Sequence, residues 1–330
     1  MLAAVRRADD PRGRLRIEEI PSPQARRGEV VLRVRACGVC RTDLHVVDAE
    51  LPPHRDRVVP GHQIVGDVAE CGEGVDDSLL GKRVGVSWLG GTDGTCPQCR
   101  AGRENLCDAP TFTGYDRDGG YAQYASARAD FTFALPDRLD DLHAAPLLCA
   151  GIIGFRALRV AEVERGERVG LFGFGASAHL ALQVLRAWEC EVYVATRGAS
   201  HREFARRLGA VWVGDALARP PVRLDRAVTF APAGDVVVSA LASLRKGGVV
   251  AINAIHLDAM PSFDYDSLLW GERQIRSVTN STRADAHDFL AIAAAVPVVA
   301  EATPFTLSDA AAALDAVRGD RIDGAAVVVP

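Results

Sequence analysis

The stretch that decides the fold is V-G-L-F-G-F-G-A-S-A, residues 169–178. A short apolar run ends in the glycines Gly173 and Gly175, apolar residues then recur at helical spacing through 180–188, and a second apolar run follows at 192–195. This order predicts a βαβ unit. Glycines between a strand and a helix let the backbone approach a pyrophosphate at the positive helix N-terminus. The residues expected to bind a dinucleotide there are Gly173, Gly175, Ala176 and Ser177.

The chain beyond this unit continues the alternation of strands and helices. Apolar runs at 208–213, 227–230 and 249–252 read as strands, and residues 236–244 have a helical pattern. A further amphipathic helix is expected at 284–295. The pattern predicts an open, doubly wound parallel sheet with covering helices, and therefore an α/β protein.

The end of the second strand bears on the choice of cofactor. Enzymes that bind NAD usually place Asp or Glu there to hold the ribose 2′-hydroxyl. This chain has Thr196 and Arg197, with Arg202 close behind. A carboxylate would repel a 2′-phosphate, whereas a hydroxyl and a guanidinium attract one. The sequence therefore favours NADP(H) over NAD(H); the alternative is that the two arginines only solvate this loop.

Length and charge narrow the class of protein. With 330 residues the chain is long enough for two domains of about 150 residues each. Its 38 basic and 43 acidic residues are mixed along the sequence and give a net charge of −5, which argues against nucleic acid as a partner. The longest uncharged stretch, 169–185, is too short and too polar to span a bilayer. Arg6 and Arg7 leave no room for a secretory signal, so we expect a cytoplasmic protein.

Three of the eight cysteines stand close together in a loop-like stretch. They form C-x2-C-x7-C, and the surrounding residues have no helical or strand period. Such a loop has little apolar surface to bury, and a structural Zn²⁺ held by thiolates would order it. A carboxylate three residues before the first cysteine is an acceptable fourth ligand, although it could also be a solvated acid. The predicted ligands are Asp93, Cys96, Cys99 and Cys107.

A second set of metal-ligating residues is scattered along the chain. Cys40 follows an alternating strand pattern at 29–36, His62 stands in P-G-H-Q, and Cys149 lies much further on. One imidazole and two thiolates leave the fourth position of a tetrahedral zinc open, as in catalytic sites. Each residue taken singly is more typical of a core, and it is the combination that favours a catalytic zinc.

Six motifs follow one another along the chain. They are C-G-V-C-R-T-D-L-H from Cys37, P-G-H-Q-I-V-G from Pro60, C-P-Q-C-x7-C from Cys96, D-G-G-Y-A-Q-Y from Asp118, L-L-C-A-G from Leu147 and G-F-G-A-S-A from Gly173. This set resembles the zinc-dependent medium-chain alcohol dehydrogenases, and most closely their compact bacterial subgroup. The resemblance implies a mainly-β GroES-like catalytic domain (1–149 and 281–330) with an inserted Rossmann domain (150–280), in a homodimer or homotetramer.

The resemblance also implies roles for single residues. Cys40, His62 and Cys149 fall where the family holds its catalytic zinc, and Thr42 where a hydroxyl contacts the substrate oxygen. His45 falls at the end of the proton relay, since an imidazole can exchange protons near neutral pH. Two further residues have supporting roles: Arg41 toward the pyrophosphate, and Asp43 as the carboxylate that orients the zinc-bound histidine.

The sequence departs from the family at three positions. Asp93 stands where the structural-zinc loop usually has its first cysteine. Gln63 replaces the glutamate that usually follows the zinc-bound histidine, which removes a charge beside the metal. Ala325 stands where many relatives carry an arginine for the cofactor phosphates, so Arg41 and the backbone are left with more of that task.

The function expected from the sequence is a zinc-dependent alcohol dehydrogenase or aldehyde reductase. It would transfer hydride between a small alcohol or aldehyde and NADP(H), with Zn²⁺ as a Lewis acid that helps the alcohol lose its proton. One alternative is a zinc-containing reductase of a conjugated alkene or imine. A second, a non-catalytic NADP(H)-binding protein, fits less well because Thr42 and His45 are both retained.

Overall fold

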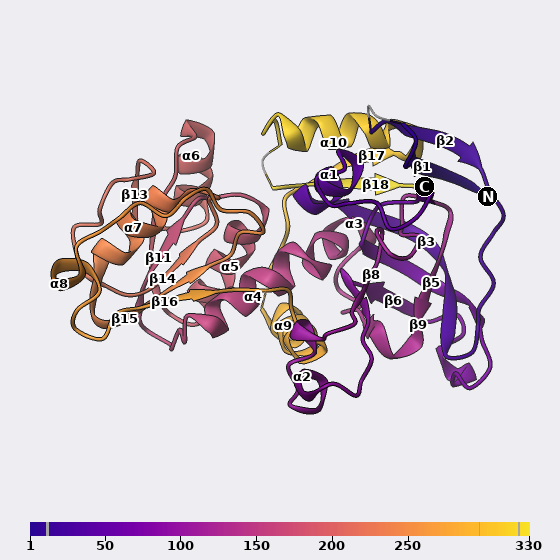
Figure 1. The fold of residues 1–330 in the computed structure, drawn as a ribbon, viewed down its shortest axis with the longest axis horizontal. Coiled ribbons are helices and arrows are strands. Elements are labelled where there is room, and N and C mark those ends of the chain that lie inside the picture. Colours follow the sequence, from indigo (N-terminus) through magenta and orange to yellow (C-terminus); the bar gives the residue numbers. More distant parts are fainter. Residues whose placement is uncertain (11–12, 297, 323) are drawn as a thin grey trace. The chain divides into compact units, whose positions relative to one another are not determined.

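The computed structural model describes residues 1–10, 13–296, 298–322 and 324–330. The chain divides into two compact units. Unit 1 comprises Met1–Cys149, Asn280–Ala291 and Ala300–Pro330, and unit 2 comprises Ala150–Thr279 and Ile292–Val299. Unit 2 is therefore inserted into the chain of unit 1, as the colours of Figure 1 show.

Unit 1 is mainly β. Its strands are β1 (Leu2–Arg7), β2 (Leu15–Glu19), β3 (Glu29–Val39), β4 (Arg57–Val58), β5 (Gln63–Cys71), β6 (Arg83–Val86), β7 (Leu89–Gly91), β8 (Thr111–Phe112), β9 (Tyr124–Arg128), β10 (Thr132–Ala134), β17 (Ala302–Thr306) and β18 (Ala325–Val329). Its helices are α1 (Arg41–Val47), α2 (Pro97–Arg100), α3 (Asp141–Ala144) and α10 (Ala310–Arg318), with short 3-10 helices η1 (Asp77–Leu79), η2 (Glu104–Leu106), η3 (Ala129–Phe131), η4 (Ala145–Leu148) and η5 (Leu307–Asp309). Helix α9 (Arg283–Ala295) begins in unit 1 and ends in unit 2.

The main sheet of unit 1 has the order β10-β6-β5-β3-β18-β17, and β9 also pairs with β3. Strand β3 is longer than its alternating pattern at 29–36 predicts, because Cys37–Val39 pair with β18 on one side, and Cys37 and Gly38 also pair with β5 on the other. The C-terminal strand thus completes a sheet that the N-terminal part begins, and α10 packs on β18 (Figure 1). The core between these elements is made of apolar residues such as Val30, Leu32 and Ala326.

Unit 2 is a parallel sheet with a helix between most successive strands. Its elements are α4 (Ala150–Val160), β11 (Arg168–Phe172), α5 (Ala176–Ala187), β12 (Glu191–Ala195), α6 (Ala199–Arg207), β13 (Trp212–Gly214), β14 (Leu224–Thr229), α7 (Gly234–Ser243), β15 (Leu244–Ile252), α8 (Tyr265–Leu268) and β16 (Gln274–Ser277). All pairs in the order β13-β12-β11-β14-β15-β16 are parallel. The strand order reverses at β11, so the carboxyl ends of β11 and β14 mark the switch point where such sheets bind ligands.

The structure confirms the predicted fold class, a mainly-β unit joined to a doubly wound parallel sheet. It corrects one strand: the apolar run 208–213 forms only the short β13, because Leu208 ends α6 and a turn follows. No single helix in the described part of the chain has the length and apolar character to cross a membrane; only the bent pair Asp141–Leu148 and Ala150–Val160, taken together, meets that test, and it does so by length and composition alone.

Candidate metal and cofactor sites

Sheet pairing brings the scattered ligands of the first site together. Strand β3 ends at Val39 and β5 begins at Gln63, and the register pairs Gly38 with Gln63. The residues just beyond the paired ends, Cys40 and His62, therefore lie side by side. Helix η4 packs on both strands and carries Cys149 at its C-terminal end. The ligand atoms of these three residues, the three-ligand cluster, all lie within 4.8 Å of one another.

The donor set of this cluster fits a metal ion. The side chain of His62 is fully buried, and its Nε2 has no hydrogen-bond partner among the described residues. A buried imidazole nitrogen without a partner is costly unless something coordinates it. Two sulfur atoms and one imidazole nitrogen are the ligands of catalytic zinc, which keeps a fourth position open.

Asp43 holds the histidine of this cluster in place. Its carboxylate is buried, and Oδ1 accepts a hydrogen bond from His62 Nδ1 at 3.0 Å. With the proton on Nδ1, the lone pair of Nε2 is free to coordinate. Asp43 also stands at the third position of α1, where Oδ2 accepts from the backbone N–H of Cys40 at 2.8 Å. One carboxylate thus ties the turn that carries Cys40 to the ring of His62.

The three ligands are electrostatically linked. A hydrogen bond from Cys149 and the proximity of His62 hold the pKa of Cys40 well below its usual value, against the effect of burial. Burial opposes the cationic form of His62, but the charge and hydrogen bond of Asp43, with help from Cys40, outweigh it and raise the pKa of His62 to about 10. The hydrogen bond to Cys40, together with burial, raises the pKa of Cys149. The metal-free cluster thus favours one thiolate and holds protons that a metal would displace.

Helix α1 places the other predicted residues near this cluster. Thr42 is buried, and its Oγ1 lies 3.6 Å from Cys40 Sγ. His45 lies one turn further along α1, is half-buried, and forms an ion pair through Nδ1 with Glu50, a partner that the sequence did not reveal. Arg41 is exposed at the start of the helix. Gln63 is buried next to the histidine.

An aromatic stack lies against the ring of His62. Trp88 meets that ring edge-on with centroids 5.0 Å apart, and it stacks on Phe112 at 4.9 Å. Tyr115 also stacks with Trp88, with ring centroids 6.2 Å apart. The stack gives His62 an aromatic neighbour.

The loop cluster consists of Asp93, Cys96, Cys99 and Cys107, whose ligand atoms also lie within 4.8 Å of one another. Backbone N–H groups are directed at these atoms: Cys99 N donates to Cys96 Sγ, and Asp93 N donates to Cys107 Sγ, each at 3.4 Å. N–H groups around sulfur favour thiolates. The loop therefore brings all four predicted residues together in a set that fits structural zinc.

Asp93 is oriented by its own turn. Its Oδ1 accepts from the backbone N–H groups of Cys96 at 2.9 Å and Thr95 at 2.7 Å. These bonds hold the pKa of the Asp93 carboxyl below its usual value. A carboxylate fixed through one oxygen keeps the other available for a cation.

The glycine loop of unit 2 has the geometry that its sequence predicts. Gly173 has φ +90°, and a Cβ there would meet Ala231 N at 2.9 Å. Around Gly175, which precedes the first turn of α5, a Cβ would meet nothing within 4 Å. The N–H groups of this turn have no side-chain cap. Ala176 and Ser177 begin the helix, so the predicted phosphate-binding residues form one helix N-terminus.

His179 lies on the buried face of α5. Its side chain is fully buried, its Nδ1 lies 3.3 Å from the carbonyl oxygen of Gly175, and its ring packs beside Phe204 at 5.5 Å. Burial lowers the pKa of His179 to about 4. A neutral imidazole therefore supports the glycine loop from within the unit.

The end of β12 keeps the three residues expected to select the cofactor together. Thr196 is buried, and Arg197 is exposed. Arg202 donates from Nη1 to the carbonyl oxygens of Thr196 at 3.0 Å and Arg197 at 2.8 Å. Arg202 thus holds the turn itself, a role that the sequence did not distinguish from phosphate binding.

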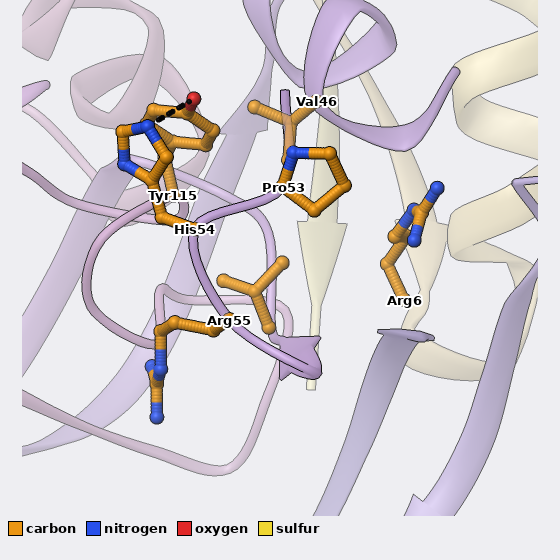
Figure 2. Close-up of a pocket in the computed structure, with 7 residues that line it drawn as sticks. Arg6, Val46, Pro53, His54, Arg55 and Tyr115 are labelled. Atoms are coloured by element: carbon orange, nitrogen blue, oxygen red, sulfur yellow. Dashed lines mark hydrogen bonds between the residues drawn. The ribbon is translucent and has the colours of Figure 1, made fainter. Parts of the chain in front are cut away.

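A small cavity lies elsewhere in unit 1. It has a volume of about 10 Å³, the size of a single water site, and it holds none of the predicted ligands. Figure 2 shows His54 Nε2 at hydrogen-bond distance from the hydroxyl of Tyr115, 3.0 Å. The lining residues are Arg6, Val46, Pro53, His54, Arg55, Val58 and Tyr115.

Comparisons with known proteins agree with this architecture. Residues 26–137 match the alcohol dehydrogenase GroES-like domain. Over 312 residues the chain is 48% identical to the probable alcohol dehydrogenase AdhA of Mycobacterium tuberculosis, covering 93% of this chain and 90% of the relative. It is 34% identical over 293 residues to an alcohol dehydrogenase of Geobacillus stearothermophilus, covering 85% and 86%. Acetophenone reductase from Geotrichum candidum, solved with NAD, superposes with a TM-score of 0.87 at 25% identity, covering 100% of this chain and 97% of that one.

Proposed function

Because the chain belongs to the zinc-type medium-chain alcohol dehydrogenase family and is an oxidoreductase acting on alcohols, we propose a specific reaction for it. It transfers hydride between an alcohol or aldehyde and NADP(H), with a catalytic zinc held by Cys40, His62 and Cys149. The observation that carries the proposal is the buried Nε2 of His62, which has no hydrogen-bond partner among the described residues although the residue clusters with two cysteines. The catalytic domain is residues 1–149 and 281–330, the cofactor domain is 150–280, and the enzyme is a homodimer or homotetramer.

When bound, zinc supplies Lewis acidity that lowers the pKa of the substrate hydroxyl, and the nicotinamide supplies the hydride acceptor. The residues of the chain orient the reactants and move the proton. Thr42 Oγ1, beside Cys40, accepts the proton from the substrate hydroxyl and passes it outward. His45, one turn along α1 and paired with Glu50, takes it to solvent. Asp43 keeps the proton of His62 on Nδ1.

The loop cluster holds a second, structural zinc. Asp93 takes the place of a fourth thiolate, and its carboxylate is already fixed by two backbone N–H groups. Zinc there orders a loop that has little apolar surface to bury. Gln63 is uncharged and buried next to His62, so the three-ligand cluster has no carboxylate at that position.

The preference for NADP(H) rests on the end of β12. No carboxylate stands at the end of this strand, where a 2′-hydroxyl would need one, and Arg197 is exposed beside Thr196. Arg197 attracts a 2′-phosphate, and Arg202 keeps the turn in shape through two backbone carbonyls. The N–H groups at the start of α5 bind the pyrophosphate.

The test is a steady-state assay of NADPH and NADH oxidation against a panel of aldehydes, with metal content measured on the same sample. The proposal expects aldehyde reduction, two zinc ions per chain and a higher kcat/KM with NADPH. Including a saturated and an unsaturated aldehyde separates carbonyl reduction from reduction of the conjugated double bond. Reduction of the double bond alone would contradict the proposed reaction.

Two substitutions test the cofactor assignment. Thr196→Asp brings a carboxylate to the 2′-phosphate position, and we expect it to lower the NADPH/NADH ratio of kcat/KM at least about tenfold. Thr196→Asn, of similar size and neutral, is the matched control. Arg197→Ala should weaken the binding of NADPH and leave the binding of NADH unchanged. If Thr196→Asp keeps the NADPH preference, the assignment is wrong.

A further inference from the structure

Tyr121 is a buried polar residue to which the reaction above gives no role. It lies between the turn Gly119–Gly120 and strand β9, and its side chain is fully buried. Its ring is wedged against Gly61, where an added Cβ would meet Tyr121 Cδ1 at 2.6 Å, and Gly61 has φ +95°. The residue next to that glycine is the zinc-ligating His62. Tyr121 therefore packs directly behind the turn that presents the histidine.

The hydroxyl of Tyr121 donates a hydrogen bond to Asp43 Oδ2 at 3.0 Å. Asp43 thus accepts four hydrogen bonds, two on each oxygen. Oδ1 accepts hydrogen bonds from His62 Nδ1 at 3.0 Å and from Gly61 N at 3.2 Å. Oδ2 accepts hydrogen bonds from Cys40 N at 2.8 Å and from the hydroxyl of Tyr121. A buried carboxylate needs hydrogen-bond donors to replace the water it has lost, and here they come from three separate segments of the chain.

The two oxygens of Asp43 have different anchors. Oδ1 is held by groups next to or within His62, so it follows that residue if the turn moves. Oδ2 is held by the backbone of Cys40 and by Tyr121, which lies outside both ligand-bearing turns. Without the phenol, Oδ2 would keep a single donor and the carboxylate would be freer to rotate. The ring of His62 would then be less well fixed toward the two sulfurs.

We propose that Tyr121 is a positioning residue of the metal site, whose hydroxyl fixes Asp43 and, through it, aims His62 Nε2 at Cys40 and Cys149. The inference rests on the proposed zinc at the three-ligand cluster. Tyr121 touches neither substrate nor metal. It acts through the carboxylate alone, so removal of its hydroxyl changes metal binding at this cluster and leaves the loop cluster as it was.

The test uses Tyr121→Phe, which removes the hydroxyl and keeps the buried ring. The full-length protein is stripped of metal and titrated with Co²⁺, a coloured substitute for Zn²⁺, against a competing chelator. The substitution is made in a Cys99→Ser background, which reports the three-ligand cluster, and in a Cys40→Ser background, which reports the loop cluster. Tyr193→Phe is the matched control, because Tyr193 is a buried tyrosine of unit 2 whose hydroxyl bonds Glu191.

We expect Tyr121→Phe to weaken Co²⁺ binding about tenfold at the three-ligand cluster, to change the d–d absorption there, and to leave the loop cluster unaltered. Equal affinities with and without the hydroxyl would overturn the inference. So would equal weakening at both clusters, because a merely structural tyrosine destabilises unit 1 as a whole. If the Cys99→Ser protein binds no Co²⁺ while Tyr121 is intact, the proposed catalytic zinc is itself wrong, and the inference falls with it.

Discussion

The two cysteine clusters of unit 1 are built in opposite ways. The loop cluster takes all its ligands from residues 93–107, and hydrogen bonds within that short segment already orient them. The three-ligand cluster takes Cys40, His62 and Cys149 from distant segments that only the pairing of β3 with β5 and the packing of η4 bring together. A local site orders its own loop, whereas a non-local site depends on the fold around it and can leave a coordination position open for chemistry.

The largest difference between the clusters concerns turnover. We expect Cys40→Ser to lower kcat/KM by at least about 10³-fold, more than 4 kcal/mol, and to leave cofactor binding intact, because the metal that activates the alcohol is lost. Cys99→Ser should lower kcat/KM only a few-fold. Steady-state kinetics and a fluorescence titration with NADPH check both. Full activity of Cys40→Ser would remove the functional distinction between the clusters.

The second difference concerns local stability. Removing one of four ligands at the loop by Cys99→Ser should cost about 3 kcal/mol of metal binding, roughly a quarter of what a structural zinc contributes. We expect zinc content to fall by one ion per chain and limited proteolysis to cut within 93–107. Cys71→Ser, at a half-exposed cysteine outside both clusters, is the control. A loop that resists the protease after metal loss would show that it is ordered without zinc.

The third difference concerns pH. In the metal-free three-ligand cluster, His62 has a pKa raised to about 10 and Cys149 a raised pKa, so both carry protons at pH 7. A metal must displace both, and its affinity therefore falls as pH falls. The expected slope between pH 6 and pH 8 is about 100-fold per pH unit, about 2.7 kcal/mol. Co²⁺ titration of the Cys99→Ser protein measures it; an affinity independent of pH would contradict protonation of His62 and Cys149 in the metal-free cluster.

The smallest effect concerns the one oxygen ligand. Asp93→Asn removes the charge from a carboxylate that two backbone N–H groups already orient, and we expect loop metal affinity to fall about tenfold, about 1.4 kcal/mol. Asp108→Asn makes the same charge change at an exposed position of the same loop and should have no effect. Chelator competition on the Cys40→Ser protein compares them. Equal affinities for the two variants would leave Asp93 as a solvated acid.

The sequence predicted the loop cluster and the glycine loop almost completely, because both are local. The spacing of three cysteines and one acid within a short loop predicts that their side chains meet, and a glycine pair between a strand and a helix predicts an uncapped helix N-terminus. Prediction from the sequence was less reliable where tertiary pairing sets the length of a strand. Residues 208–213 gave only a short strand, and β3 runs to Val39 because two neighbours pair with its end.

Other parts of the site could be seen only in the fold. Three features depend on side-chain packing: His45 pairs with Glu50, Arg202 holds the turn after β12, and His179 is buried. Tyr121 appeared in the sequence only as one letter of D-G-G-Y-A-Q-Y. No periodicity relates it to Asp43, since the two residues are far apart in the chain and meet only inside the sheet core.

The sequence by itself determined the fold class, the family and the types of side chain in the two clusters. The hydrophobic period, the placement of glycines and the spacing of cysteines could be read there because each acts over a few residues at a time. The tertiary structure decided which distant groups meet: a thiolate, an imidazole and a second thiol in one cluster, with one carboxylate and one phenol behind the imidazole. The physical reason is that strand register and core packing are long-range. A side chain's partners and its loss of water are set by segments that the local sequence does not contain.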